Sequence, residues 1–226
     1  MEGTRKRFHH SLADLEAEVV EAGRLAEHAV GESVRSIVHR DDAVADAVIA
    51  GDDEIDSRYL DIEKVVLDTL ALQTPVASDL RLVSAIMHIN LHVERIGDQA
   101  VNIAKMSKLT RALPSSPVIL SHLEEMSALV CTLIRASMEA FERRDLELCM
   151  KLPEMDDPVD ALNRGMLGEV VKLADDPAKL EWGISMNVVA RHLERAGDNA
   201  VDIAEQVSFL LTGEFKEFTD ASHDES

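Results

Sequence analysis

Apolar residues recur at intervals of three or four along almost the whole chain of 226 residues. Between residues 7 and 39 the apolar series is Leu12, Leu15, Val19, Ala22, Ala26, Val30, Val34 and Ile37. This spacing places the apolar side chains on one face of an α-helix, whereas a half-buried strand would need strict alternation. The pattern continues in segments 42–72, 76–111, 118–143, 146–174 and 177–211. The sequence therefore predicts an all-α protein of six long helices.

Charge and composition narrow the classes of function. The chain has 43 Asp and Glu against 23 Lys and Arg, a formal net charge of −20. Nucleic acids and anionic membranes are bound through Lys and Arg, so neither is an expected partner. Uncharged runs reach only about a dozen residues, short of the roughly 20 that a membrane span needs. We expect a cytoplasmic protein without membrane insertion, in which Cys131 and Cys149 are buried and reduced.

A Pro/Ser segment at 114–117 is the clearest linker in the chain, and the helical plan starts again after it. Residues 1–113 and 118–212 are therefore predicted to form two tandem three-helix units. Residues 213–226, which begin with a glycine, are expected to form a flexible acidic tail.

An internal repeat supports this division. The run His92-Val-Glu-Arg-Ile-Gly-Asp-Gln-Ala-Val-Asn-Ile-Ala104 aligns at an offset of 100 with His192-Leu-Glu-Arg-Ala-Gly-Asp-Asn-Ala-Val-Asp-Ile-Ala204, and nine of the thirteen positions are identical. A weaker match pairs residues 51–56 with 155–160 at an offset of 104. Amphipathicity alone repeats apolar character but not polar identity. The two halves are therefore interpreted as copies of one unit.

The repeat carries acidic residues that helix stability alone would not select. Glu94 and Asp98 are one turn apart on one face, and Asn102 continues the stripe. The equivalent stripe in the second copy consists of Glu194, Asp198 and Asp202. Like charges at this spacing cost a helix roughly 0.2–0.5 kcal/mol, and the intervening Gly97 or Gly197 costs about 1 kcal/mol relative to Ala. Since both choices recur, these positions are predicted to form a site, and the glycines to leave room for a close neighbour.

The second and fifth predicted helices carry a further set of acidic pairs. These pairs are Asp52 with Asp56 and Asp156 with Asp160. Opposed pairs would gather four carboxylates in each unit, which persist only when protonated, solvated or neutralised by cations. Oxygen ligands favour magnesium, calcium, manganese or oxidised iron, with zinc tolerated. Pro158 lies within the second pair, and a helix that began there with Asp157 as its N-cap would weaken the same-face argument.

Other interpretations of these residues stay open. The carboxylates could instead be solvated and neutralised by arginines such as Arg95, Arg195 and Arg81. His92 and His192 lie about 200° around the helix from the glutamates and are expected to face away from them. Motifs for phosphate loops, dinucleotide sites and nucleophile elbows are lacking, and no Glu has a His three residues later, as a di-metal enzyme would need. The motifs therefore weigh against an enzyme.

The chain resembles the PhoU family of phosphate-transport regulators. The resemblance lies in the run Leu70-Ala-Leu-Gln-Thr-Pro-Val-Ala-Ser-Asp-Leu-Arg81 and in both copies of the repeated motif, and it covers about residues 5–212. It implies two tandem three-helix bundles related by a pseudo-twofold axis. It also implies no catalysis, and negative control of phosphate uptake and of the phosphate-starvation response.

The resemblance implies partners and a cofactor as well. PhoU-like proteins act on the cytoplasmic side of the phosphate ABC transporter, so the expected partners are its ATPase subunit, the sensor histidine kinase and a second copy in a homodimer. Some members carry iron or other metal clusters on paired acidic motifs, which map here onto Asp52, Asp56, Glu94 and Asp98, and onto Asp156, Asp160, Glu194 and Asp198. Since Asn102 stands where the second copy has Asp202, the two sites are expected to differ in affinity. The rival hypotheses are a metal-storing or metal-dependent helical-bundle enzyme and a plain helical scaffold.

Overall fold

Six α-helices make up the structure, a computed structural model that describes residues 2–218. Their bounds are α1 (Glu2–His39), α2 (Asp42–Gln73), α3 (Ser78–Thr110), α4 (Pro117–Arg143), α5 (Leu146–Val171) and α6 (Pro177–Thr212). Within residues 2–218 there is no strand. The predicted all-α fold with six long helices is confirmed.

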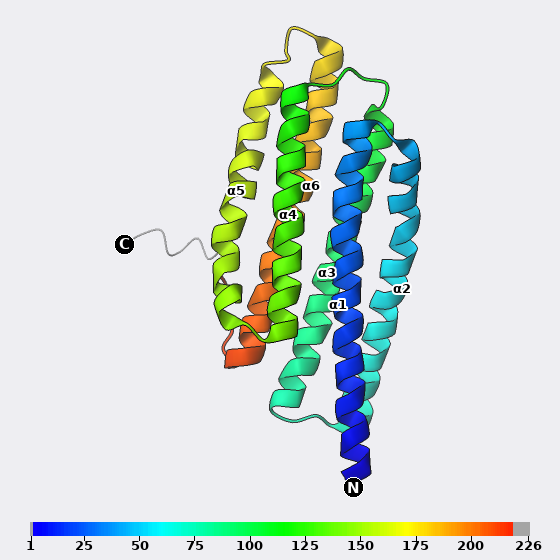
Figure 1. Ribbon diagram of the computed structural model, residues 1–226, viewed down its shortest axis with the longest axis vertical. Helices are drawn as coiled ribbons and strands as arrows, with labels where there is room; N and C mark the ends of the chain where they lie inside the picture. Colours follow the sequence, from blue (N-terminus) through cyan, green and yellow to red (C-terminus); the bar gives the residue numbers. More distant parts are fainter. Residues whose placement is uncertain (1, 219–226) are drawn as a thin grey trace, which may run out of the picture.

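The helices form two three-helix bundles that lie side by side (Figure 1). Helices α1–α3 form the first bundle and α4–α6 the second, and within each bundle consecutive helices run antiparallel. The bundles meet where α3 packs along α6 and where α1 packs along α4. Buried apolar residues from both bundles form one continuous cluster, so the two units share a single hydrophobic core.

Three of the helices begin at an aspartate N-cap. Asp41, Asp145 and Asp176 precede α2, α5 and α6, and each accepts a backbone hydrogen bond from the first turn of its helix at 3.0–3.2 Å. These bonds satisfy N–H groups that lack a partner within the helix. Gly213 caps the end of α6: its φ of +78° lies in the left-handed region, and its N–H donates to the Phe209 carbonyl.

Hydrogen bonds from Arg40 attach the segment that connects the two bundles to the first bundle. Residues 111–116 join α3 to α4, and Pro117 occupies the first turn of α4. Arg40, between α1 and α2, donates hydrogen bonds to the carbonyls of Arg111 at 3.2 Å and Leu113 at 2.9 Å. The Pro/Ser linker predicted from the sequence therefore lies where the chain passes between bundles.

The break expected in the fifth helix is wrong. Pro153 and Pro158 both lie inside α5, which begins at its Asp145 cap and not at residue 157. Each proline removes one backbone hydrogen bond and crowds the preceding turn, at a cost of about 3 kcal/mol. Helix α5 packs along both α4 and α6, so tertiary packing offsets this cost. Asp156 and Asp160 consequently remain one turn apart on the same face.

Helix α4 is the helix within residues 2–218 that is long and apolar enough to cross a membrane by length and composition alone. The expectation of no membrane insertion rests on uncharged runs of about a dozen residues and stays a prediction for α4. Its residues Ile119, Leu123, Met126 and Val130 are fully buried among the other helices. That burial is the pattern of a core helix in a helical bundle.

The described part of the predicted tail folds back on α6. The ring of Phe215 stacks on Phe209 with the centroids 4.0 Å apart, and the backbone N–H of Phe218 donates to Glu205 at 2.6 Å. The remainder of the predicted tail, residues 219–226, lies outside the described residues.

Two reciprocal polar contacts join the bundles across α3 and α6. The Nδ1 atom of His92 lies 2.9 Å from Asn199 Oδ1, and Nδ1 of His192 lies 2.7 Å from Gln99 Oε1. The four residues exchange when the offset of 100 is applied, as in an interface around a twofold axis. Both histidines turn toward the neighbouring bundle, in agreement with the prediction that they face away from the glutamates of their own helices.

Candidate metal centre

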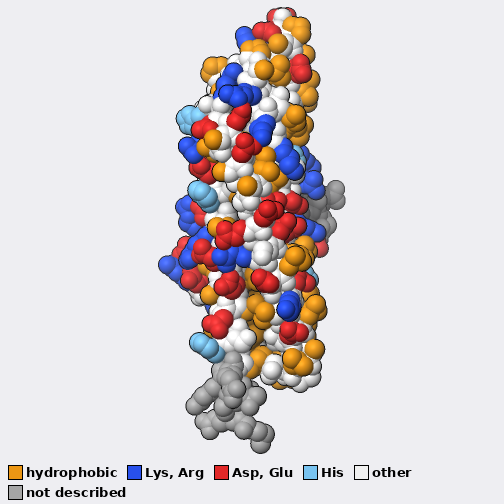
Figure 2. All heavy atoms as spheres, turned by 90° about the vertical axis from the view of Figure 1, so that its right-hand side faces the viewer, with side chains coloured by type: hydrophobic (Ala, Val, Ile, Leu, Met, Phe, Trp, Pro, Cys, Tyr) orange, Lys and Arg blue, Asp and Glu red, His pale blue; other side chains and the backbone are white. Residues whose placement is uncertain are grey.

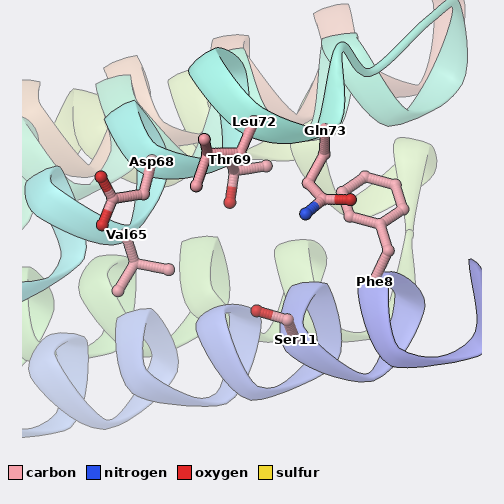
Figure 3. A pocket seen from close by; sticks show the side chains of 7 residues that line it. All are labelled: Phe8, Ser11, Val65, Asp68, Thr69, Leu72 and Gln73. Carbon is pink, nitrogen blue, oxygen red and sulfur yellow. The ribbon is translucent and has the colours of Figure 1, made fainter. Parts of the chain in front are cut away.

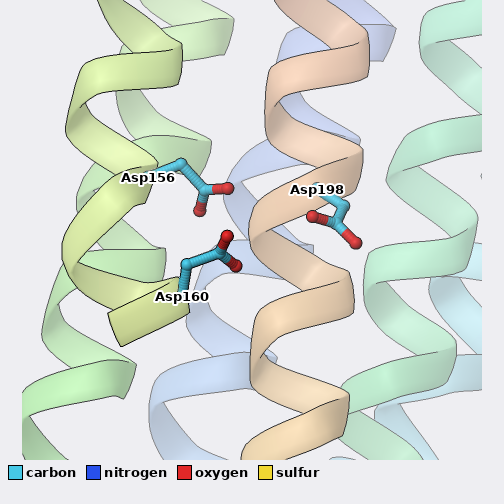
Figure 4. Close-up of side chains that lie close together, drawn as sticks. All are labelled: Asp156, Asp160 and Asp198. Atoms are coloured by element: carbon cyan, nitrogen blue, oxygen red, sulfur yellow. The ribbon is translucent and has the colours of Figure 1, made fainter. Parts of the chain in front are cut away.

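Three aspartates of the second bundle meet between α5 and α6. Asp156 and Asp160 project from successive turns of α5 toward α6, which carries Asp198 (Figure 4). One carboxylate oxygen of each lies within 4.8 Å of the other two. Ligand distances of about 2.0–2.6 Å allow oxygens on one ion to stand up to roughly 5 Å apart. The geometry therefore allows a single cation to contact all three.

Asp156 is the most deeply buried member of this cluster, with 7% of its surface exposed. Its Oδ1 atom is buried and has no hydrogen-bond partner among the described residues. Burial, followed by the charges of Asp160 and Asp198, raises the pKa of Asp156 to about 7. Burial and then Asp160 also raise the pKa of Asp198. Protons or a cation are needed to hold these carboxylates together.

Glu194 lies on the same face of α6, one turn before Asp198. It is 9% exposed, and its Oε2 atom has no partner among the described residues. Its Oε1 accepts a hydrogen bond from Arg191 at 2.8 Å, and burial raises its pKa. Arg164 pairs similarly with Asp160, at 3.2 Å. Part of the negative charge is therefore neutralised within the second bundle.

The arginines that the sequence suggested as partners of these carboxylates, Arg95, Arg195 and Arg81, are not the ones that pair with them. Among the described residues, Arg95 and Arg195 form no ion pair within 4.0 Å, and the guanidinium of Arg81 lies instead near Gly213 at the end of α6. The pairing arginines stand three residues before Glu194 and four after Asp160, so the helix spacing of charges could have found them.

Gly197 explains how the Asp156 carboxylate fits against α6. A Cβ at this position would lie 2.6 Å from Asp156 Oδ1, closer than real Cβ atoms come to their neighbours. The glycine therefore leaves the space that the carboxylate occupies, as the sequence pattern predicted.

The first bundle has a looser version of this arrangement. Asp52, Asp56, Glu94 and Asp98 lie on the facing sides of α2 and α3. Burial, then Asp56 and Asp98, raise the pKa of Asp52 to about 6, and burial and then Asp98 raise that of Glu94. Asp98 is exposed like its counterpart Asp198, but Asp56 is exposed where Asp160 is half-buried, and among the described residues this set does not bring three ligand atoms within 4.8 Å of one another.

The last two predicted ligands, Asn102 and Asp202, are not part of the close triad. Asn102 is half-buried on α3. Oδ2 of Asp202 lies 3.4 Å from Nδ1 of His92, which reaches across from the first bundle. Residue spacing within one helix could not reveal this contact between distant segments.

A groove lies away from both clusters, between the start of α1 and the end of α2. It has a volume of about 380 Å³, and its walls include Phe8, Val65, Leu72 and the single carboxylate of Asp68 (Figure 3). One carboxylate among apolar and neutral polar groups offers little to a metal ion. The acidic clusters therefore remain the stronger candidates for a cation site.

Comparison with known proteins places this arrangement in a family. The model of the PhoU domain matches residues 19–107 and, a second time, residues 123–207. The chain belongs to the PhoU family. The two matched segments fall within the two bundles, one in each, which supports the internal duplication inferred from the repeated motif.

The sequences of individual PhoU proteins align with this chain along nearly their whole length. The phosphate-specific transport system accessory protein PhoU homolog of Caulobacter vibrioides is 36% identical over 215 residues, covering 94% of this chain and 93% of that protein. The Clostridium acetobutylicum protein of the same description is 30% identical over 219 residues, 96% of this chain and 100% of the relative.

Solved PhoU structures share the fold. The crystal structure of PhoU from Pseudomonas aeruginosa superposes with a TM-score of 0.87 at 29% identity, covering 92% of this chain and all of that one. The PhoU protein from Streptococcus pneumoniae, described as a phosphate transport system regulatory protein, gives 0.83 at 26% identity, covering 93% and 99%.

Proposed function

We propose that this chain is a regulatory accessory protein of phosphate transport, which lowers phosphate uptake and phosphate-starvation signalling when phosphate is plentiful. The observation that carries the proposal is the double match to the PhoU domain, one in each bundle. Relatives aligned over almost their full length are named as accessory proteins of the phosphate-specific transport system. A crystal structure of similar fold is described as a regulatory protein of phosphate transport.

The proposed mode of action is contact rather than catalysis. The chain would act in the cytoplasm as a homodimeric adaptor between the ATPase subunit of the phosphate transporter and its sensor histidine kinase. Long helices with exposed outer faces suit docking against partner helices. The groove between the start of α1 and the end of α2 offers a partner apolar side chains beside the single carboxylate of Asp68.

The cluster in the second bundle is proposed to hold a metal ion. Asp156 Oδ1 and Glu194 Oε2 are buried acceptors without a hydrogen-bond partner among the described residues, and a cation bound by the triad would give the Asp156 carboxylate a partner. The donors Asp156, Asp160, Glu194 and Asp198 are all carboxylates, which fits magnesium, calcium, manganese or iron, with zinc a weaker fit. A bound ion would neutralise the like charges and tie α5 to α6.

The proposal is tested by deleting the gene in its own organism and growing the strain in phosphate-rich medium. We expect phosphate uptake and phosphatase expression to rise in the deletion strain and to fall again when the wild-type gene is restored. We also expect the tagged protein to purify with the transporter ATPase. The deletion strain is also given the gene for Asp156→Asn or for the control Glu154→Gln, which changes an exposed residue of the same helix. Comparing how far each variant lowers phosphate uptake shows whether the cluster is needed for regulation. Unchanged uptake and phosphatase expression after deletion would contradict the regulatory function.

A further inference from the structure

A second groove lies between α1 and the first half of α2. We call it the Gly51 groove, and it has a volume of about 240 Å³. Its apolar walls include Leu25, Ala29, Val44, Val48, Gly51 and Ile55, and none of the candidate metal ligands lines it. Figure 2 looks onto the α2 side of the first bundle, where hydrophobic side chains lie exposed among acidic and basic ones.

The turn after α1 is repeated after α4, which fixes how the two copies align in this region. Arg40 and Arg144 both stand in the left-handed region, with φ of +53° and +57°. The next residues, Asp41 and Asp145, cap the following helices, and the backbone N–H of each donates at 3.0 Å to a carbonyl in the last turn of the helix before it. These matches have an offset of 104, so α1 and α2 can be compared with α4 and α5 residue by residue.

The second bundle has longer apolar side chains at the positions that line the Gly51 groove. The corresponding pairs, first bundle then second, are Ala29 and Leu133, Val44 and Leu148, Val48 and Leu152, and Gly51 and Met155. All four residues of the second bundle lie in its apolar core or pack against it. Among the apolar walls, Ile55 is the one that exceeds its counterpart, Val159, and it does so by one methylene. The groove is therefore the space that these longer side chains fill in the second copy.

Gly51 accounts for the largest of these differences. It is exposed on α2, and a Cβ at this position would meet nothing within 4 Å among the described residues. Gly97 and Gly197, in contrast, make room for Ile55 and Asp156 of the neighbouring helices. Glycine inside a helix is less favourable than alanine, and no close neighbour within residues 2–218 explains its presence at residue 51. The open space is suited to a side chain that comes from another molecule.

We propose that the Gly51 groove receives one methionine or leucine side chain from an amphipathic helix of a basic partner protein. The inserted side chain would take the place that Met155 takes in the second bundle. A groove between two helices suits an apolar residue presented by a third helix. Burial of that side chain against Val44, Val48 and Ile55 would supply the apolar part of the binding free energy.

Charge indicates what the partner carries beside this side chain. Glu32 and Glu54 line the groove, but Glu32 pairs with Arg35 and Glu54 with Arg58, so the groove itself is close to neutral. The whole chain carries a formal charge of −20. That field attracts a helix with Lys and Arg on its outer side and repels a second copy of the chain.

The test uses two fluorescent helical peptides of about five turns, built from alanine and lysine. One peptide has a single central methionine on its alanine face, and the matched peptide has alanine there. Binding to the full chain is followed by fluorescence anisotropy. Both peptides carry the same charge, so their difference in affinity reports the methionine alone. The wild-type chain should bind the methionine peptide about tenfold more tightly than the alanine peptide.

Gly51→Met fills the groove from within the chain. Because a Cβ at residue 51 has open space and Met155 stands at the equivalent position, we expect the variant to fold with a Tm no lower than that of the wild type. It should bind the two peptides with affinities within about twofold of each other. Gly168→Met is the matched control, since Gly168 is also exposed on a helix with nothing within 4 Å of a Cβ. The control should keep the tenfold preference.

Equal affinity of the wild type for the two peptides, or a preference that Gly51→Met retains, would overturn the proposal. Sedimentation velocity covers the other occupant. A wild-type dimer that dissociates in Gly51→Met but not in Gly168→Met would assign the groove to a second copy and would also overturn it. Loss of the preference in Gly51→Met alone, with an unchanged oligomeric state, would support it. The inference adds a surface to the proposed adaptor role without depending on it, because the peptide assay and the deletion assay can fail separately.

Discussion

Gly197 of α6 approaches Asp156 of α5 so closely that a Cβ on the glycine would lie 2.6 Å from Asp156 Oδ1. At the equivalent place in the first bundle, a Cβ on Gly97 would lie 3.5 Å from Asp52 Oδ1, an ordinary van der Waals contact. The Asp156 carboxylate is therefore set deeper against its neighbouring helix. This difference accompanies its burial and its closer grouping with Asp160.

Gly197→Ala is expected to displace the Asp156 carboxylate and to weaken cation binding by about 10–100-fold, the range seen when the support of a metal ligand is lost. Titration calorimetry with manganese measures this. Gly165→Ala is the matched control, because Gly165 is exposed on α5 and a Cβ there meets nothing within 4 Å. The control should bind as wild type and gain roughly 0.5–1 kcal/mol of stability. Wild-type affinity in Gly197→Ala would contradict the close fit.

The raised carboxyl pKa values predict how the metal-free protein responds to pH. Asp156 has a folded pKa of about 7 and Asp52 of about 6, both above the values of an unfolded chain. From about pH 4 to pH 7 the folded state binds more protons than the unfolded state, so the free energy of unfolding falls as pH rises. We expect the metal-free protein, kept in chelator, to lose about 2 kcal/mol of its free energy of unfolding between about pH 5 and pH 8. Its Tm should then fall by roughly 4–8 °C over this range.

Asp156→Asn isolates the contribution of the cluster to this pH dependence. The amide does not ionise, so the Tm of the variant should fall less than that of the wild type over the same pH range. Differential scanning calorimetry of both proteins in EDTA gives the comparison. Identical pH profiles would show that the Asp156 carboxyl does not carry a raised pKa.

The contact between His92 and Asn199 predicts a measurable link between the bundles. Asn199→Ala takes this bond from the buried His92 ring, and His92→Ala takes it from the half-buried Asn199 amide, so each variant should cost about 1–3 kcal/mol in urea unfolding. The double variant should reveal a coupling of about 1 kcal/mol. His10→Ala, at an exposed position of α1, should change stability by less than about 0.5 kcal/mol. A coupling near zero would mean that the two side chains do not interact.

The helices could be predicted from the sequence because amphipathic periodicity reports burial along each segment. The Asp41, Asp145 and Asp176 caps lie at or next to the predicted helix starts. The error concerned Pro158, since local propensity opposes a helix there while packing against α4 and α6 maintains it. Such packing depends on distant segments and is not visible in a local pattern.

In the candidate site, too, local spacing could be predicted from the sequence, but contacts between distant segments could not. The spacing and repetition of Asp156, Asp160 and Asp198 indicated the close triad. The sequence did not show that Asp56 of the first bundle is exposed while Asp160 of the second is half-buried, because burial depends on how the helices pack. The contact of His92 with Asp202 arises only when the bundles meet, 110 residues apart in the chain.

The central structural claim is that the carboxylates around Asp156 form a cation site. The most direct measurement is the metal content per chain, determined by elemental analysis after dialysis, of the wild type, Asp156→Asn and the control Glu154→Gln. We expect the wild type and Glu154→Gln to retain the same amount of metal, and Asp156→Asn to retain about one ion less per chain. Equal metal content in all three proteins would contradict the claim.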